Sequence, residues 1–446
     1  MLSSRLPKDL SPSPFFAELE RAKADVLAEC ANADALPFID MTVSSPVKAG
    51  LPVDLDDAVD EGRKAFGNWS PDAAGWKSAR EAVVEYYRER GGNFTAGQII
   101  LTASTSEAYS VLFKTFCDPG DVIMTPMPGY PLLDTLAQLE HLECAPYFLK
   151  LKRERFDKLT DLKKVTERRS APAEVNAFRF VLDSDSLLAA PEHAKILLLV
   201  SPHNPTGHCV SREEWNEAVR FCEENNMILV VDEVFGDYAF SDKVSRTWQY
   251  VFGERENVIL DPGVPSAIGE GIWDAGGGDF INLPENGPKC PIFWLNGLSK
   301  AVGSPQLKLG WMAFYAPREN FEEIRAALEF VEDAYLSVSA PAQALGISLL
   351  PKAAAYESKV LDRLQQNWQT LREAFPSKYC PEVLGGWYAV VRLGEDDEEL
   401  TLRLLREKHV LVQPGFFFDF DEDGWVVMSL LQDPAIFKEA IQRIKQ

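Results

Sequence analysis

The chain has 446 residues, of which 46% are hydrophobic and 25% charged. That length exceeds what one compact core usually supports, so we expect two domains with a substantial buried interior. The 45 Lys and Arg residues are outnumbered by 68 Asp and Glu, which gives a formal net charge of -23. Such an acidic surface repels phosphate backbones and anionic lipids, so we expect neither nucleic acid nor a membrane as a partner.

The cysteines and histidines do not form a metal-binding or disulfide pattern. The seven cysteines are scattered and include no CxxC pair, and the five histidines form no HExxH motif. Reduced structural thiols and no bound metal are therefore expected. The first 16 residues lack the apolar core of a signal peptide, and no stretch reaches the length of a membrane span. These features predict a cytoplasmic protein.

Strand and helix patterns alternate through the first two thirds of the chain. A helix over 15–30 and an extended run before Pro46 come first, followed by a helix over 80–90 that ends at Gly91 and Gly92. From there the pattern predicts strands at 98–102, 121–126, 145–149, 195–200 and 227–231, with helices at 104–116, 130–140 and 211–226 between them. This alternation predicts βαβ units and a mostly parallel sheet.

Two segments interrupt the alternation, and the last part of the chain differs in style. Residues 150–193 begin with a charged run that suggests a solvated helical surface, and residues 241–290 read as a long loop. Helices are predicted at 318–335 and 353–375. Strands at GGWYAVVRL, LVQPGFFFDF and GWVVMSLL, with helices at 398–408 and 434–445, then predict a compact α+β unit.

Four polar signals follow predicted strands. They are the run Ser104-Thr105-Ser106, Asn204 within SPHNPTG, Asp232 after MILVV, and Lys300 after PIFWL. Because the carboxyl ends of parallel strands meet at one edge of a sheet, these groups should converge on one crevice. A single lysine at a strand exit is usually only a side chain that reaches toward water. The hydroxyl run, the amide and the carboxylate that accompany Lys300 favour a functional role for this lysine instead.

An anion site, an amide, a buried carboxylate and a lysine are the set that a pyridoxal phosphate enzyme needs. The lysine forms a Schiff base with the cofactor aldehyde, the carboxylate keeps the pyridine nitrogen protonated, and the phosphate anchors the cofactor. Hydroxyls and free backbone N–H groups at a helix start supply the anion site.

From about Asp40 to Gln446 the sequence resembles the fold-type I pyridoxal phosphate enzymes, specifically the class I/II aminotransferases. The motifs that carry the resemblance are SPHNPTG, DEV and GLSKAVGSPQLKLGW, with weaker support from WSPDAAGWKSAREAVVEYY and GGWYAVV. The resemblance implies an α/β fold, with a large domain built on a mostly parallel sheet covered by helices and a smaller α+β domain. We place an arm and part of the small domain at 1–55, the large cofactor-binding domain at 56–335, and the small domain at 336–446.

The resemblance also implies roles for individual residues. Lys300, preceded by Ser299, resembles the Schiff-base lysine that also carries the substrate proton. Asp232 resembles the partner of the pyridine nitrogen, and Asn204 the amide that binds the phenolic oxygen of the cofactor. Tyr130 resembles the aromatic residue that stacks on the cofactor ring, although an aromatic before proline is also typical of a turn packed on the core. Ser104, Thr105 and Ser106 are similar to the phosphate loop.

Four positions depart from the family pattern. Phe235 stands where a tyrosine usually donates to the phenolic oxygen, and Lys308 stands where an arginine usually grips the phosphate. Trp69 replaces a tyrosine that reaches the phosphate of the partner subunit. Val427 replaces the arginine that binds the substrate α-carboxylate. Either Arg392 or Lys48 substitutes for that arginine, or the substrate is not an ordinary α-amino acid.

The resemblance therefore predicts a homodimeric transaminase with shared active sites that exchanges an amino group between an amino donor and a 2-keto acid by a ping-pong mechanism. Two alternatives remain open. The first is a pyridoxal phosphate lyase or synthase, and the second is a cofactor-binding protein of the same fold without turnover.

Overall fold

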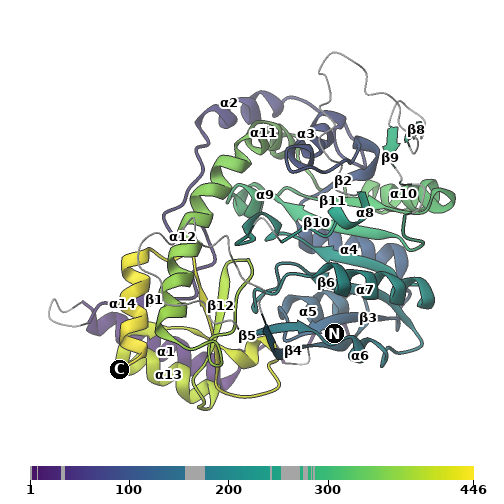
Figure 1. The fold of residues 1–446 in the computed structure, drawn as a ribbon. Helices are drawn as coiled ribbons and strands as arrows, with labels where there is room; N and C mark the ends of the chain where they lie inside the picture. The colour runs from purple at the N-terminus through teal and green to yellow at the C-terminus, as the bar shows by residue number, and fades with distance from the viewer. Residues whose placement is uncertain are drawn as a thin grey trace.

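An eight-stranded sheet forms the centre of the larger structural unit (Figure 1). The computed structural model describes residues 3–7, 9–31, 36–155, 176–241, 244–252, 272–274, 280–282, 284 and 287–446. The strand order is β2-β11-β10-β7-β6-β3-β4-β5. The strands are β2 (Ile99–Thr102), β3 (Val122–Met127), β4 (Glu143–Arg155), β5 (Asn176–Leu182), β6 (Ala194–Val200), β7 (Ile228–Asp232), β10 (Ile292–Gly297) and β11 (Gly310–Tyr315).

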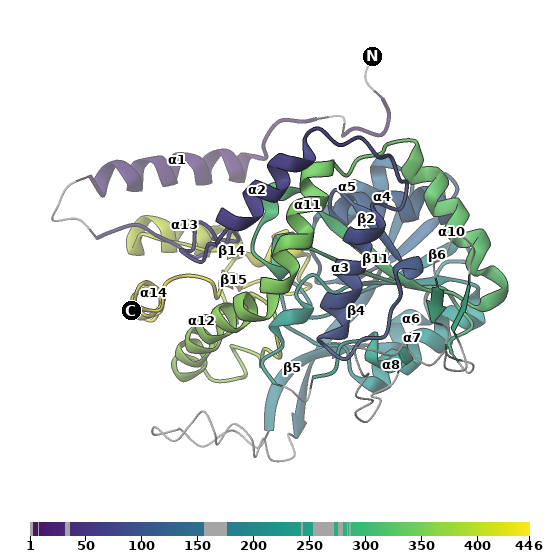
Figure 2. The same ribbon diagram turned by 90° about the horizontal axis from the view of Figure 1, so that it is seen from above.

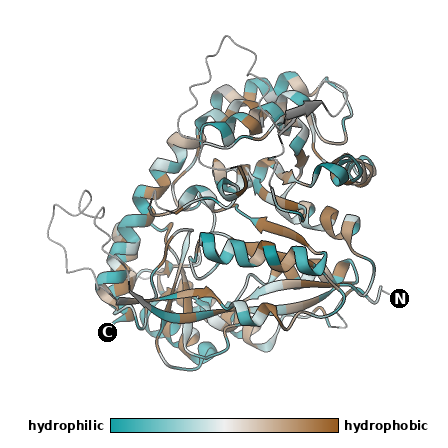
Figure 3. Ribbon diagram, turned by 45° about the vertical axis from the view of Figure 1, so that its right-hand side comes forward, coloured by the Kyte–Doolittle hydropathy of each residue, from teal (hydrophilic) through white to brown (hydrophobic). Residues whose placement is uncertain are grey.

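Most neighbouring strands of this sheet are parallel, as the alternation of elements predicted. The run β10-β7-β6-β3-β4 is parallel throughout, whereas β11 is antiparallel to both β10 and β2, and β5 is antiparallel to β4. Strands covered on both faces must be apolar along their whole length. Accordingly, all residues of β10 and β11 are buried, and the inner strands are coloured as hydrophobic in Figure 3.

Helices cover both faces of the sheet. Figure 2 shows α4 and α5 on one side of the sheet and α6 and α7 on the other. Local signals explain where the helices start and stop: Ser104 caps α4 by accepting from the Glu107 N–H, and Ser211 and Glu214 form a capping box on α7. The helices of this unit are α2 (Asp56–Ala65), α3 (Lys77–Arg88), α4 (Thr105–Phe116), α5 (Leu132–Leu139), α6 (Ser184–Leu187), α7 (Arg212–Asn225), α8 (Gln249–Phe252), α9 (Leu298–Ala301), α10 (Arg318–Asp333) and α11 (Ala340–Leu349).

A smaller unit combines the start and the end of the chain. The long helix α12 (Ala353–Ala374) runs to it from the larger unit (Figure 1). The smaller unit contains a three-stranded antiparallel sheet with the order β12-β15-β14. In the same unit, β1 pairs in parallel with β13. The elements are α1 (Pro14–Glu29), β1 (Ile39–Asp40), β12 (Tyr388–Arg392), α13 (Asp397–Lys408), β13 (Val410–Leu411), β14 (Gln413–Pro414), β15 (Trp425–Ser429) and α14 (Pro434–Ile444).

Two local predictions were wrong. Residues 150–155 are the end of β4 rather than a helical surface, and they pair with β5 in a ribbon. In the predicted strand LVQPGFFFDF, the strand pairing ends at Pro414, and Gly415–Phe418 form a 3-10 turn. Of the predicted loop at 241–290, the described parts include α8 and the short pair β8 (Ile272–Asp274) and β9 (Phe280–Asn282). Residues 242–243, 253–271, 275–279, 283 and 285–286 of that segment, like residues 156–175, lie outside the described residues.

The fold has the two-unit architecture that the sequence predicted, although the limits of 1–55, 56–335 and 336–446 stay predictions. Helix α11, which follows the proposed limit, packs against α2 and α3 on the side of the larger unit. Within the described ranges, no helix has the length and apolarity needed to cross a membrane, and no cluster of three potential metal ligands occurs. All seven cysteines are free thiols.

Candidate active site

The predicted site residues lie at one edge of the large sheet. Asp232 ends β7, and Lys300 lies in α9, which begins directly after β10. Ser104 follows β2, and the SPHNPTG segment follows β6. The strands β2, β11, β10, β7 and β6 are consecutive in the sheet. Groups far apart in sequence are thus brought to adjacent strand ends, where open α/β sheets bind ligands.

Lys300 is half-buried, and its amine lies beside two aromatic rings. Its Nζ lies 4.6 Å from the centroid of the Trp387 ring and 5.3 Å from that of Phe235. Burial lowers the pKa of Lys300 to about 8, and the nearby carboxylate of Asp232 opposes that shift. The main chain is also held, because the Tyr238 hydroxyl donates to the Lys300 carbonyl at 2.6 Å. A lysine in this environment is partly neutral near physiological pH and can act as a nucleophile.

Both oxygens of the Asp232 carboxyl group accept hydrogen bonds. The Tyr109 hydroxyl donates to Oδ2 at 2.6 Å, and the Val234 N–H donates to Oδ1 at 3.0 Å. Burial raises the pKa of Asp232, while these two donors and the charge of Lys300 lower it. Asp232 is therefore a half-buried acceptor whose orientation is set by two donors, rather than a solvated strand cap.

The start of α4 and the start of β11 approach each other closely. A Cβ at Gly310 would lie 3.0 Å from the carbonyl carbon of Ser104, so a side chain there would press on the backbone. The Ser104 hydroxyl caps the helix, and Thr105 and Ser106 begin it. Lys308 precedes Gly310 in a left-handed conformation with φ 52°, and its side chain is exposed. Free N–H groups at a helix start, with a cation nearby, suit an anion.

The SPHNPTG segment forms a tight turn that holds Asn204 in the interior. The Gly207 N–H donates to the His203 carbonyl at 2.8 Å, and His203 Nδ1 lies 2.9 Å from the Thr206 hydroxyl. Burial, followed by the nearby His208, lowers the pKa of His203 to about 3, so its ring is neutral. The buried Oδ1 of Asn204 has no hydrogen-bond partner among the described residues. An unpaired buried amide is costly unless a ligand satisfies it.

An aromatic wall joins the two units at this point, and we define it as Tyr130, Phe235, Trp387 and Tyr388. The Phe235 ring lies 5.3 Å from Trp387 and 6.0 Å from Tyr388, measured between centroids. Burial, and next the neighbouring Tyr130, raise the pKa of Tyr388. Tyr130 is half-exposed. Phe235 and Tyr130 come from the larger unit and the other two from β12 or the residue before it, so the wall depends on how the units pack.

Of the two candidate carboxylate-binding cations, Arg392 is already paired with other groups. Arg392 ends β12, where it forms an ion pair with Glu422 and donates from Nε to the Asp423 carbonyl at 3.3 Å. Because a strand advances about 3.3 Å per residue, Arg392 lies roughly 16 Å along the chain from Trp387. The Lys48 side chain is exposed. The structure therefore gives no support to either residue as the missing clamp.

Val427 lies on the same face of the small sheet as Tyr388. The register pairs Tyr388 with Ser429 and Val390 with Val427, and side chains two apart on a strand share a face. Val427 is fully buried at 0% exposure. The position where the family pattern has an arginine is thus part of an apolar surface that continues from Tyr388.

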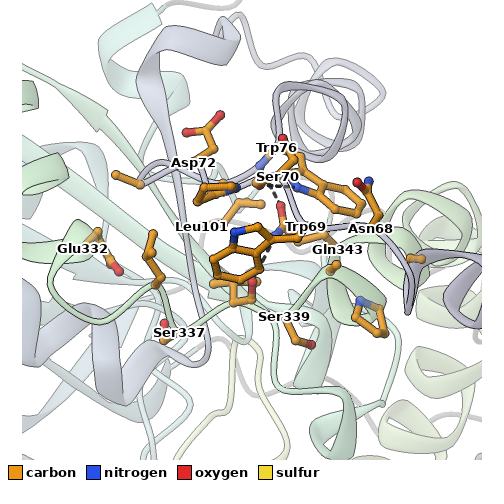
Figure 4. A pocket seen from close by; sticks show the side chains of 18 of the residues that line it. Asn68, Trp69, Ser70, Asp72, Trp76, Leu101, Glu332, Ser337, Ser339 and Gln343 are labelled. Atoms are coloured by element: carbon orange, nitrogen blue, oxygen red, sulfur yellow. Dashed lines mark hydrogen bonds between the residues drawn. The ribbon is translucent and has the colours of Figure 1, made fainter.

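Trp69 lies apart from Lys300, on the rim of a separate cavity of about 320 Å³ (Figure 4). Its side chain is 78% exposed. Trp76, Asp72, Gln343 and Glu332 also line this cavity. The Trp76 indole N–H donates to the Ser70 carbonyl at 3.0 Å, and the main-chain N–H of Trp76 donates to the Gln343 side-chain oxygen at 2.6 Å. These two hydrogen bonds hold the cavity wall in place.

Three functional positions were not assigned from the sequence. Trp387 and Tyr388 lie within the motif GGWYAVV, but only the packing of the two units brings Trp387 to Lys300 and Tyr388 to Phe235. The sequence does contain a signal for Tyr109. The buried face of α4 includes Ala108, Leu112 and Phe113, and Tyr109 is its one residue with a hydroxyl group. A buried phenol needs an acceptor. Which acceptor it meets depends on the tertiary structure.

Known proteins share both the sequence pattern and the fold. The profile of the family "Aminotransferase class I and II" matches residues 55–444. The chain belongs to this aminotransferase family. The aminotransferase is 23% identical over 389 residues to the glutamate-pyruvate aminotransferase AlaA of Haemophilus influenzae, covering 84% of this chain and 81% of that protein. It is 21% identical over 389 residues to a tyrosine aminotransferase of Caenorhabditis elegans, covering 85% and 71%.

Solved structures agree with the fold of the aminotransferase. The alanine aminotransferase of Pyrococcus furiosus superimposes with a TM-score of 0.72 at 20% identity, covering 98% of both chains. An aspartate aminotransferase of Thermotoga maritima gives a TM-score of 0.72 at 18% identity, covering 100% of this chain and 99% of that one. The fold is that of the fold-type I aminotransferases, and the chain is a transaminase.

Proposed function

We propose that this transaminase uses pyridoxal phosphate bound at Lys300 to move an amino group from an amino donor to a 2-keto acid in a ping-pong reaction. The observation that carries the proposal is the half-buried Lys300, with a pKa of about 8, near the half-buried carboxylate of Asp232. When bound, the cofactor supplies an aldehyde that takes up the amino group and a ring that accepts electrons from the substrate carbon.

The residues at the sheet edge fit this cofactor. The buried Oδ1 of the half-buried Asn204 has no partner among the described residues, and the cofactor would supply that partner. The close approach of Gly310 to Ser104 leaves a side-chain-free cradle at the start of α4, where Thr105 and Ser106 would hold the phosphate and the exposed Lys308 would add charge. Phosphate at a helix N-terminus is favourable.

The remaining side chains would orient the reactants. Asp232 would hold a proton on the ring nitrogen, because its anion is placed by two donors. Tyr130 would lie against the ring face. Lys300 would carry the proton of the reacting carbon, since its pKa near 8 lets the amine accept and release a proton close to neutral pH.

We further propose a homodimer in which Trp69 completes the site of the partner. Trp69 is 78% exposed beside a cavity, an unusual position for a tryptophan. Its indole would donate one hydrogen bond to the phosphate in the other subunit. If so, Trp69→Ala weakens both dimerisation and cofactor binding, whereas the exposed Phe330, changed to Ala, leaves cofactor binding unchanged.

The apolar surface at Val427 favours a second candidate. A substrate carboxylate is normally bound by a charged donor. The rings of Phe235 and Trp387 lie beside the Lys300 amine instead, and Val427 is a buried apolar residue. The substrate would then be an amine without a clamped α-carboxylate, or the same cofactor would serve a lyase reaction. Release of pyruvate and ammonia without a keto acceptor would identify a lyase.

The deciding experiment follows the colour of the purified protein. A transaminase loaded with pyridoxal phosphate is bleached by its amino donor and restored by a keto acid. We expect this cycle with at least one member of a broad panel of amines and amino acids. Failure of every donor to bleach a protein that has bound the cofactor through Lys300 would refute the proposed reaction and favour the non-catalytic alternative.

A further inference from the structure

The hydrogen bond between Tyr109 and Asp232 connects α4 to the end of β7. Tyr109 is 4% exposed, and its hydroxyl lies 2.6 Å from Asp232 Oδ2. The other oxygen is taken by the Val234 N–H at 3.0 Å. With one donor on each oxygen, the plane of the carboxylate is fixed. A charge-assisted O–H···O⁻ bond of this length is among the stronger hydrogen bonds in proteins.

Tyr109 is also the main local group that favours the anion of Asp232. Burial raises the pKa of Asp232, and among the influences that lower it the Tyr109 hydroxyl comes first, ahead of the Val234 N–H and the charge of Lys300. The charge of Lys300 is itself only partial near neutral pH, because its pKa is about 8. The Tyr109 hydroxyl, whose pKa burial raises well above its usual value, stays protonated and keeps donating.

The position of Tyr109 on α4 adds a geometric point. Thr105 and Ser106 start this helix and would hold the phosphate, and Tyr109 lies one turn further along, about 6 Å from Thr105 at the rise of an α-helix. One rigid helix therefore contacts both proposed anchor points of the cofactor, the phosphate directly and the ring nitrogen through Asp232.

We propose that Tyr109 is a positioning residue that holds Asp232 ionised and oriented toward the ring nitrogen of the cofactor. This inference rests on the proposed function, since Asp232 acts on the ring only if pyridoxal phosphate binds. Tyr109 would touch neither cofactor nor substrate, and its whole effect would pass through the carboxylate.

The first test compares two tyrosine-to-phenylalanine variants. Tyr109→Phe removes the donor to Asp232. Tyr147→Phe is the matched control, because Tyr147 is equally buried but donates to the Leu198 carbonyl at 2.8 Å. Titration of the apoprotein with pyridoxal phosphate, followed by tryptophan fluorescence, gives the dissociation constant at each pH. We expect Tyr109→Phe to weaken binding roughly 10-fold to 100-fold and the control less than about twofold.

The pH dependence supplies a signature that a packing role would not. Loss of the Tyr109 donor raises the pKa of Asp232 further, so the acid limb of cofactor binding should move to higher pH in Tyr109→Phe. The charged and titratable groups that face this pair are Lys300 from α9 and Tyr147 from β4. The charge of Lys300 lowers the pKa of Asp232, and Tyr147 raises the pKa of Tyr109. The control should keep the wild-type limb.

A double-mutant cycle decides whether Tyr109 acts through the carboxylate. In an Asp232→Asn background, Tyr109→Phe should change cofactor affinity less than about twofold. Urea unfolding of the four apoproteins provides a second reading, in which the two substitutions should also be coupled. An unaltered affinity and acid limb in Tyr109→Phe would overturn the inference, as would an equal loss in the Asn background. Wild-type protein that fails to bind pyridoxal phosphate would instead overturn the proposed function, and this inference with it.

Discussion

Glu332→Gln should stabilise the protein, and increasingly so as the pH rises. Glu332 lies near the end of α10, is 2% exposed, and its buried Oε1 has no partner among the described residues. Burial, and next the charge of Glu107, raise the pKa of Glu332 to about 8 from 4.5. A neutral amide of nearly the same shape removes the need to hold a proton in the folded state.

The magnitude and sign follow from these two pKa values. Between pH 4.5 and 8 the unfolded chain has released the Glu332 proton while the folded protein still holds it, so the free energy of unfolding falls as pH rises. At about 1.4 kcal/mol per pKa unit, the loss between pH 5 and pH 8 is roughly 3 kcal/mol. The Glu332→Gln variant should not show this loss of unfolding free energy between pH 5 and pH 8.

Urea unfolding of the apoprotein at one protein concentration, repeated from pH 5 to pH 8.5, measures the effect. Glu329→Gln is the control, because Glu329 is on the same helix and pairs with Arg325 at a partly exposed position. That exchange should change stability by less than about 1 kcal/mol. If the wild-type and Glu332→Gln curves run parallel across this pH range, Glu332 does not hold its proton in the folded state.

Three further outcomes are expected at the proposed site. Lys300→Ala should reduce amino transfer at least ~1000-fold while the protein keeps its thermal unfolding midpoint, and retention of more than a tenth of the activity would exclude Lys300 as the reactive amine. Phe235→Tyr should lower the pKa of the Lys300–cofactor Schiff base by about one unit, because a new donor favours the ionised phenolic oxygen; identical absorbance titrations of both proteins would contradict this. Arg392→Ala should leave the Michaelis constant of each accepted acid within about twofold, since Arg392 is paired with Glu422; a tenfold rise would restore Arg392 as the carboxylate ligand.

The positions of the main site residues could be predicted because their signals are local. Lys300 and Asp232 each follow a run of apolar residues that must be a buried strand, and parallel strands bring such positions to one edge. The same logic failed for Lys150 to Arg155, where the charges hid a period of two. In the structure Leu149 and Leu151 face inward while Lys150 and Lys152 face outward on the β4–β5 ribbon.

Other parts of the site could not be predicted because they depend on contacts between distant elements. The bond from Tyr109 to Asp232 joins residues 123 positions apart. The approach of Trp387 to Lys300 depends on how the small unit packs against the large one. Arg392 was considered as a carboxylate ligand on residue type alone, and no local pattern indicated that it would form an ion pair with Glu422.

The pairing of β1 with β13 has a consequence for how the chain is made. Ile39 aligns with Val410, about 370 residues later, and the Ser429 N–H donates to the Met41 carbonyl. During synthesis the strands of the large sheet, from Ile99 to Tyr315, all emerge before either of these partners does. The segment around Ile39 must therefore wait unpaired until the residues around Val410 and Ser429 have left the ribosome. Such late, non-local pairing is slow, so we expect the large unit to fold first and the small unit to close only after Ser429 has emerged.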